Sequence, residues 1–147
     1  MRMANVAYGQ FKAKKTFYKG IMFDSNLEAR TAEALDEMGI CWTFHEACFR
    51  DRRFPYGQYT PDFMLSDGRF VEVAGVFDER HERNAQVLTH LLGSTGENPT
   101  LIVVDGDGNC REWFEADMGG ETAILNRTCR QFGNSGNLFE DAGMKRF

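Results

Sequence analysis

The stretch that decides the fold is residues 58–76, QYTPDFMLSDGRFVEVAGV. Two runs in it, 58–65 and 69–76, are rich in aromatic and β-branched residues and flank a polar turn, a pattern typical of a β-hairpin. A three-residue loop, 66–68, pairs residue 65 with residue 69 and puts Gly68 at the left-handed position that such loops favour. A two-residue loop would pair 66 with 69 instead. We favour the three-residue loop.

The choice of loop decides whether two acids meet. The three-residue loop places Asp62 opposite Glu72, whereas the two-residue loop puts them on opposite faces of the hairpin. Strand alternation gives Glu72 and Ala74 one face, and Val71 and Val73 the other. A carboxylate in such an apolar strand is costly to bury without a partner, and opposed carboxylates repel each other. A bound divalent cation removes both costs, so the hairpin predicts a metal site.

A helix is predicted upstream of the hairpin, over residues 24–38. Ser25 and Glu28 have the spacing of a capping box, the apolar residues that follow have helical periodicity, and Gly39 is a natural stop. Glu28 is therefore either a helix-capping residue or a third acid of the site.

The rest of the chain completes a mixed α/β order of elements. The predicted elements are a strand over 41–49, an exposed basic loop over 50–57, a helix that Asp78 caps and that ends at Gly93, a strand over 100–104 buried on both faces, a turn over 105–109, an edge strand over 110–114 and a helix near 121–132. No regular structure is predicted for the Gly- and Asn-rich tail. The core is thus a helix, a three-strand antiparallel meander, a helix and a strand, with C-terminal additions.

Length and charge divide this single domain into three parts. The 147 residues suit one domain, with a basic arm over 1–20, a core over 21–114 and a C-terminal helix and tail over 115–147. The net charge is −5, yet residues 1–20 hold five basic residues and no acid. A basic arm beside an acidic site is typical of a metal-dependent nuclease, although a merely solubilising arm has the same composition.

Other classes of protein fit the sequence poorly. No apolar run approaches the ~20 residues that span a bilayer, and no secretory signal is seen at the start, so we expect no membrane association. The four cysteines form no C-x-x-C pair, and reduced thiols in the cytoplasm of a bacterial or phage-infected cell are expected.

Three short motifs in this order resemble a known nuclease superfamily. They are Phe23-x-Ser25-x-x-Glu28, Tyr59-x-Pro61-Asp62-Phe63 and Val71-Glu72-Val73-Ala74-Gly75. Together they resemble the PD-(D/E)XK nucleases, in particular the branch of phage resolvases and TnsA-like endonucleases, over roughly residues 17–105. The resemblance implies a restriction-endonuclease-like core, DNA as the substrate and a homodimer.

The resemblance also implies roles for individual residues. Asp62, Glu72 and the backbone carbonyl of Val73 would bind Mg²⁺, for which Mn²⁺ can substitute, and Glu28 would reach the metal directly or through water. Hard oxygen ligands suit Mg²⁺.

The sequence departs from the superfamily at one catalytic position. The motif lysine, which orients or deprotonates the attacking water, is replaced by Ala74. Arg80 and Arg83 are the nearest cations, but arginine is a poor base. We interpret the chain as a magnesium-dependent DNA endonuclease impaired at this position, and favour an engineered Lys→Ala exchange because the flanking motif is intact. The alternative is a naturally inactive module that binds DNA or protein.

The candidate DNA-binding residues are all basic, although such charges are often only solvated. They are Lys12, Lys14, Lys15, Lys19, Arg50, Arg52, Arg53, Arg80 and Arg83.

Overall fold

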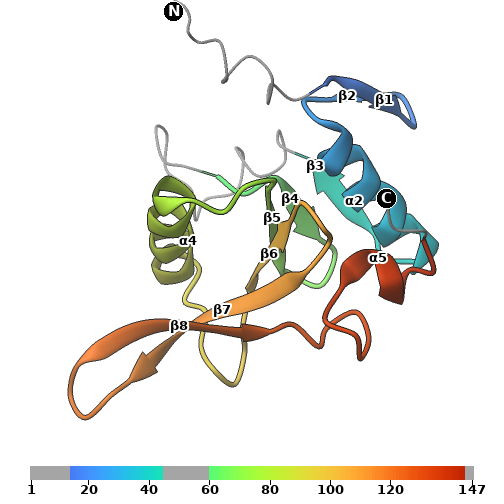
Figure 1. Cartoon of the computed structure of the whole chain (residues 1–147). Coiled ribbons are helices and arrows are strands. Elements are labelled where there is room, and N and C mark those ends of the chain that lie inside the picture. Colours follow the sequence, from blue (N-terminus) through green and yellow to red (C-terminus); the bar gives the residue numbers. More distant parts are fainter. Residues whose placement is uncertain (1–13, 45–59, 145–147) are drawn as a thin grey trace, which may run out of the picture.

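The protein folds as a six-stranded mixed sheet between helices (Figure 1). The structure, a computed structural model, describes residues 14–44 and 60–144. The helices are α2 (Asn26–Glu37), α4 (Glu79–Leu91) and α5 (Leu138–Asp141). The strands are β1 (Thr16–Tyr18), β2 (Ile21–Phe23), β3 (Trp42–Phe44), β4 (Phe63–Leu65), β5 (Phe70–Ala74), β6 (Leu101–Asp105), β7 (Cys110–Asp117) and β8 (Thr122–Thr128).

The order of strands in the sheet follows the order in the chain, from β3 to β8. Every neighbouring pair is antiparallel except β5 and β6, which are parallel. Helix α4 makes the crossover that a parallel pair requires. The predicted order of helix, antiparallel three-strand meander, helix and strand is therefore confirmed.

The predicted β4–β5 hairpin is confirmed in its register. Phe63 pairs with Val71, and the Leu65 amide donates to the Arg69 carbonyl at 2.8 Å, so residues 66–68 form the loop. Gly68 has a φ of 93°, the left-handed conformation that the three-residue loop requires.

Capping side chains and glycine residues set where both long helices begin and end. The Ser25 hydroxyl caps α2 by accepting from the Glu28 amide at 3.1 Å, and the Asp78 carboxylate caps α4 by accepting from the His81 amide at 3.0 Å. Gly39 and Gly93 follow the two helices with φ values of 72° and 62°.

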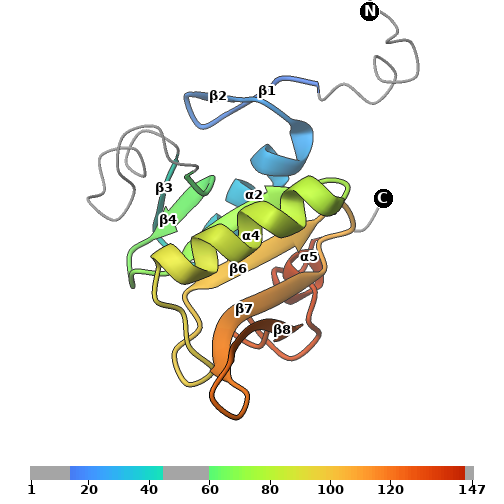
Figure 2. The ribbon, with the colours of Figure 1, turned by 90° about the vertical axis from the view of Figure 1, so that its left-hand side faces the viewer.

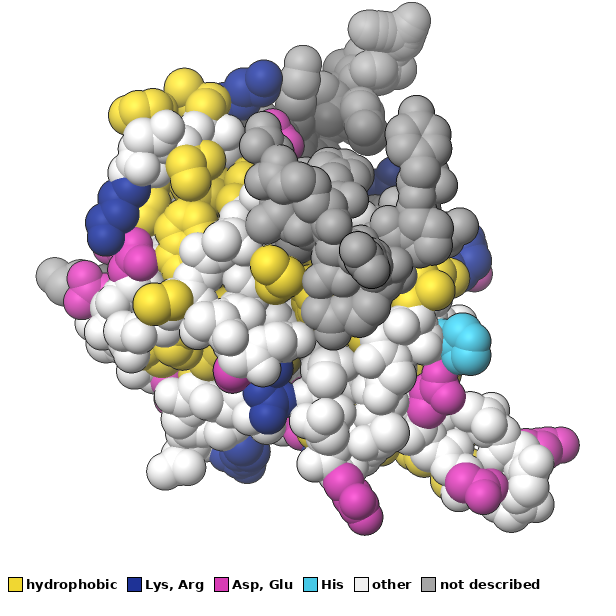
Figure 3. Space-filling view, turned by 180° about the vertical axis from the view of Figure 1, so that it is seen from behind, with side chains coloured by type: hydrophobic (Ala, Val, Ile, Leu, Met, Phe, Trp, Pro, Cys, Tyr) yellow, Lys and Arg dark blue, Asp and Glu magenta, His cyan; other side chains and the backbone are white. Residues whose placement is uncertain are grey.

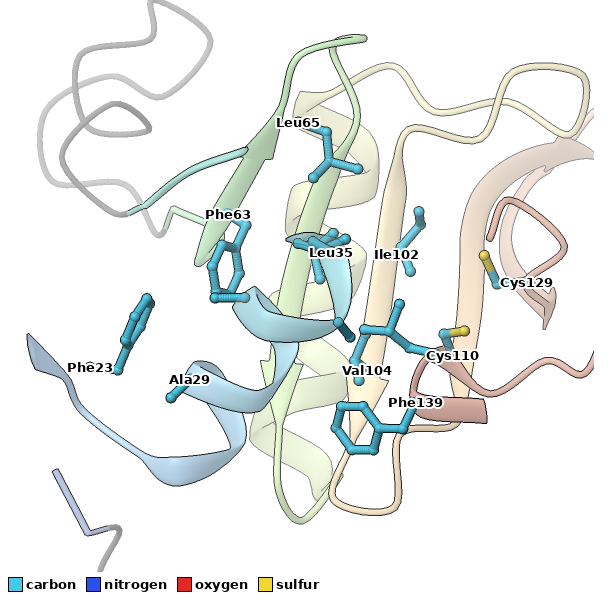
Figure 4. Packing of buried hydrophobic residues seen from close by; sticks show 14 residues of the cluster. Phe23, Ala29, Leu35, Phe63, Leu65, Ile102, Val104, Cys110, Cys129 and Phe139 are labelled. Carbon is cyan, nitrogen blue, oxygen red and sulfur yellow. The ribbon is translucent and has the colours of Figure 1, made fainter. Parts of the chain in front are cut away.

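Two apolar clusters hold the helices on opposite faces of the sheet (Figure 2). The first packs α2 and α5 on one face and includes Phe23, Phe63, Val71 and Phe139 (Figure 4). The second packs α4 on the other face and includes Phe70, Ala74, Leu88 and Trp113. Strand β6 contributes to both clusters and is buried on both faces, as predicted.

The prediction of a helix near 121–132 is wrong, because residues 122–128 form strand β8. The overlooked signal is Gly119-Gly120, the pair favoured in tight two-residue hairpin turns because both residues adopt positive φ. Their φ values are 72° and 97°, and the Met118 amide donates to the Glu121 carbonyl at 2.7 Å. β7 consequently extends to Asp117 and is not the predicted edge strand, since β8 forms the edge.

The described parts of both terminal regions form elements that the sequence analysis did not predict. The tail forms α5, which the Asn137 side chain caps, and Leu138 and Phe139 of this helix are buried in the first cluster. Strand β1 lies in the predicted basic arm and pairs with β2, which follows the arm.

Some predictions lie outside the described residues. The strand predicted over 41–49 is described only to Phe44, and the loop predicted over 50–57 is not described. Within the described part of the chain, no helix is long and apolar enough to span a membrane.

Candidate functional site

The two predicted acids of the hairpin lie opposite each other. The β4–β5 register, continued by one residue beyond Phe63, brings Asp62 opposite Glu72. The Val73 amide donates to Asp62 Oδ2 at 2.8 Å, so the Asp62 side chain is turned toward β5. Glu72 is only 3% exposed although it carries a carboxylate. The Asp62 and Glu72 side chains thus both lie along β5, where the extended register aligns them.

The third predicted acid, Glu28, binds the backbone just before its own helix. Its Oε1 atom accepts from the Asp24 amide at 3.0 Å, and the side chain is 8% exposed. The start of α2 lies beside the end of β5, since a Cβ added at Gly75 would lie 3.9 Å from Cδ2 of Leu27. Glu28 therefore fixes the chain where it enters α2, and a role in the metal site stays a prediction.

A magnesium site does not require a closed cage of protein ligands. Within residues 14–44 and 60–144, no three His, Cys, Asp or Glu side chains form a group that could hold a metal ion. Magnesium is usually held by one or two carboxylates together with waters and substrate phosphates. Asp62 and Glu72 offer two carboxylates of this kind, and a magnesium site between them stays a prediction.

Ala74, at the position of the motif lysine, is part of the apolar packing. It is 1% exposed and lies in the second cluster with Ala85 and Leu88 of α4. In the parallel register it pairs with Asp105, whose side chain therefore emerges on the same face. A longer side chain at residue 74 must extend toward the end of the strand to escape this packing.

One of the predicted DNA-binding lysines contributes to a polar cluster around Asp36. Lys19 Nζ lies 3.0 Å from Asp36 Oδ2, and the Tyr18 hydroxyl and the Trp42 indole donate to the same carboxylate at 2.7 and 2.9 Å. Burial by itself would raise the pKa of Asp36, but the hydrogen bonds outweigh it and hold the pKa below its ordinary value. The charged carboxylate thus joins β1, α2 and β3.

The other predicted basic residues divide into described and undescribed ones. Lys14, Lys15, Arg80 and Arg83 are exposed. On the face that Figure 3 shows, basic side chains are scattered among acidic ones. The remaining members of the prediction, Lys12, Arg50, Arg52 and Arg53, lie outside the described residues.

A cavity that the sequence analysis did not identify lies on the α4 face of the sheet. Its volume is about 310 Å³, and its lining residues are Phe77, Glu82, Val103, Asp105, Asn109, Arg111, Trp113 and Asn126. These residues come from the loop before α4, from α4, β6, the β6–β7 turn, β7 and β8, which only the tertiary fold brings together. No sequence spacing could have revealed them.

Comparison with known proteins identifies the family. No curated protein and no solved structure shows significant similarity to the chain. Residues 6–92 match the family model described as phage endonuclease I. The match covers more than half of the chain and includes α2, the β4–β5 hairpin and α4. The chain therefore belongs to the phage endonuclease I family.

Proposed function

We propose that the protein is a magnesium-dependent endonuclease that hydrolyses phosphodiester bonds of DNA, with a restriction-endonuclease-like core of the PD-(D/E)XK type. The observation that carries the proposal is the opposition of Asp62 and Glu72 across the hairpin, in a member of a phage endonuclease family. The homodimer that the resemblance implies stays a prediction.

The chain offers oxygen ligands from both strands of the hairpin. Asp62, Glu72 and the Val73 carbonyl would hold Mg²⁺, with Glu28 reaching it directly or through water. When bound, the cation supplies a Lewis acid that offsets phosphate charge and acidifies a water molecule. The Val73 amide, which donates to Asp62, fixes the orientation of that carboxylate. Burial of Glu72 keeps bulk water from screening its charge.

DNA would be held by charges outside this pair. Lys14 and Lys15 precede β1, and Arg80 and Arg83 lie in the first two turns of α4. Basic side chains bind phosphates without regard to sequence. We propose that these residues position the strand whose phosphate meets Asp62 and Glu72.

The alanine at position 74 limits the chemistry. A lysine two residues after Glu72 would emerge on the same strand face, about 6–7 Å along the chain. Its ammonium could contact both the attacking water and a phosphate oxygen. Asp105, the register partner of Ala74, would favour the charged form of such a lysine. We therefore propose that the present chain is catalytically impaired.

The burial of Ala74 supports a second candidate function. Because Ala74 is buried in the second cluster, it suits the core as a native residue would. This observation favours a nuclease-like module that binds DNA or protein without cutting it.

The substitution Ala74→Lys decides between these functions. We expect the variant to cut DNA about 10²–10⁴-fold faster than the present chain, the factor commonly supplied by a positioned catalytic group. Cleavage of linear, nicked and four-way-junction DNA would be followed with Mg²⁺ and with EDTA, and the activity should vanish with EDTA.

Two controls separate catalysis from packing. Ala74→Met has a similar length without an ammonium, so it should bind DNA but gain no activity. Adding Glu72→Gln to the lysine variant should abolish the gain. If the lysine variant folds and binds both DNA and Mg²⁺ yet cuts none of the substrates, the chain is the binding module.

A further inference from the structure

The cavity on the α4 face lies between the start of α4 and the last three strands of the sheet. Figure 2 shows that α4 crosses the sheet over β6 and leaves much of β7 and β8 uncovered. The cavity volume of about 310 Å³ lies at the lower end of the ~300–1,000 Å³ typical of small-molecule sites. The space therefore suits one small ring system.

Aromatic rings form part of the cavity wall. Phe77 stacks on Trp113 with centroids 5.6 Å apart and an interplanar angle of 29°. Trp113 is buried, whereas Phe77 is 38% exposed and available to a ligand. Stacked aromatic side chains of this kind offer a flat surface to a planar ring.

The polar groups of the cavity suit the hydrogen-bonding edge of a planar heterocycle better than they suit a phosphate. The Arg111 guanidinium donates to the side-chain oxygen of Asn126, and because that bond uses only the oxygen, the amide NH2 of the same side chain can serve as a donor in the cavity. Glu82 and Asp105 add two carboxylates against the single guanidinium of Arg111. Two negative charges against one positive charge disfavour an anion, while donors and acceptors together suit a neutral heterocycle.

The cavity directly adjoins the candidate catalytic residues. Val103 and Asp105 line it and are the register partners of Glu72 and Ala74. Neighbouring strands lie about 4.8 Å apart, so a ligand here sits one strand away from Glu72. Most of the lining lies beyond residue 92, where the family match ends.

We propose that this cavity receives one unpaired nucleobase of the bound DNA strand, next to the phosphate that Asp62 and Glu72 engage. The inference rests on the proposed function, since it assumes that DNA is the ligand. The base stacks on Phe77, and its edge accepts from the Asn126 amide. The cavity thereby selects DNA in which a base near the reacting phosphate has left the helix, a step that costs least where the base is already unpaired.

The test compares two DNA probes in binding experiments without metal, so that cleavage plays no part. One probe is a fully paired duplex, and the other has a single unpaired 5-iodouracil. We expect Phe77→Leu, which keeps an apolar contact with Trp113, to weaken binding of the second probe about tenfold, a typical effect of losing one base-stacking contact. Asn126→Asp retains an acceptor for Arg111 but removes the donor, and should act in the same direction.

The matched control is Leu125→Ala. Leu125 has nearly the same exposure as Phe77, 37%, and is adjacent to Asn126 in β8 but does not line the cavity. It should leave both affinities unchanged. Ultraviolet irradiation should cross-link the iodouracil to Phe77 or Trp113.

The possible outcomes separate this inference from the proposed function. Cross-links that map only outside the cavity overturn the inference, as do variants that bind both probes as tightly as the unaltered chain. An equal loss for both probes also overturns it, because the residues would then contact DNA generally. Failure of the unaltered chain to bind either probe refutes the proposed function and this inference together.

Discussion

The β4–β5 and β7–β8 hairpins belong to one sheet but differ in what surrounds them. In the first hairpin, β5 is buried on both faces and flanked by β6. In the second, β8 is the edge strand (Figure 1). Its side chains are largely exposed. The first holds the candidate acids, while the second contributes Arg111, Trp113 and Asn126 to the cavity.

The difference teaches that burial and turn chemistry are separate determinants of a hairpin. The first hairpin is stabilised by packing against two helices. The second depends more on its Gly119-Gly120 turn and on polar contacts between strands, such as the 2.7 Å ion pair of Glu112 and Arg127. The hairpins should therefore respond differently to the same kind of substitution.

The largest contrast is expected from removing one apolar side chain in each hairpin. Phe63→Ala should lower the free energy of unfolding by about 3–5 kcal/mol, because Phe63 is fully buried against Phe23, Trp42 and Phe44. Leu125→Ala should change it by less than about 0.5 kcal/mol. Denaturant unfolding measures both.

If Phe63→Ala does not fold, Phe63→Leu provides a milder variant that should still lose more stability than Leu125→Ala. Equal losses at the two positions would contradict the comparison.

An intermediate effect is expected from matched glycine substitutions in the two turns. Gly68 and Gly120 have φ values of 93° and 97°, and an added Cβ meets nothing within 4 Å at either position. Alanine at each should therefore cost about 1–2 kcal/mol, from the backbone conformation alone. Hydrogen exchange should show where the loss falls.

We expect Gly68→Ala to accelerate exchange throughout the core, and Gly120→Ala to accelerate it mainly in β7 and β8. A purely local effect of Gly68→Ala would show that the first hairpin is not coupled to the packing around it.

The smallest effect is expected from the ion pair of the second hairpin, and it depends on pH. Burial by itself would raise the pKa of Glu112, but hydrogen bonds from Gln131, Arg127 and the Arg130 amide lower it below 4.5, the ordinary value. A depressed folded-state pKa stabilises the fold above the unfolded pKa, and that stability is lost as pH falls through the folded value. Glu112→Gln should therefore cost about 1 kcal/mol near neutral pH, since Arg127 is half-exposed.

The cost should shrink as pH falls below 4.5, as measured by denaturant unfolding from pH 7 downward. Glu121→Gln, an exchange at an exposed residue of the same hairpin, should show neither effect. A constant difference across the pH range would mean that the carboxylate charge contributes nothing.

The first hairpin could be predicted from the sequence because local signals agree there. Gly68 fixes the loop length, and the loop length fixes which residues oppose Asp62 and Glu72. In the second hairpin, the helical interpretation of residues 121–132 ignored the Gly119-Gly120 turn. Exposure on both faces of β8 leaves no clear alternation from which a strand could be recognised.

The candidate site was predictable only where its residues are close in sequence. Asp62 and Glu72 lie in one hairpin, so a register argument suffices. The lining of the cavity depends on the parallel pairing of β5 with β6 and on where α4 crosses the sheet. Neither can be deduced from residue spacing, because both are set by contacts between distant segments.

The parallel pairing of β5 with β6 also bears on where the family similarity ends. The matched segment stops at residue 92, after α4 and before β6. A polypeptide cut there would keep both acids, but β5 would become an open edge with unsatisfied amide and carbonyl groups along a strand buried on both faces. Any relative that is similar only over this segment must therefore supply a replacement strand, either from its own later residues or from a second molecule.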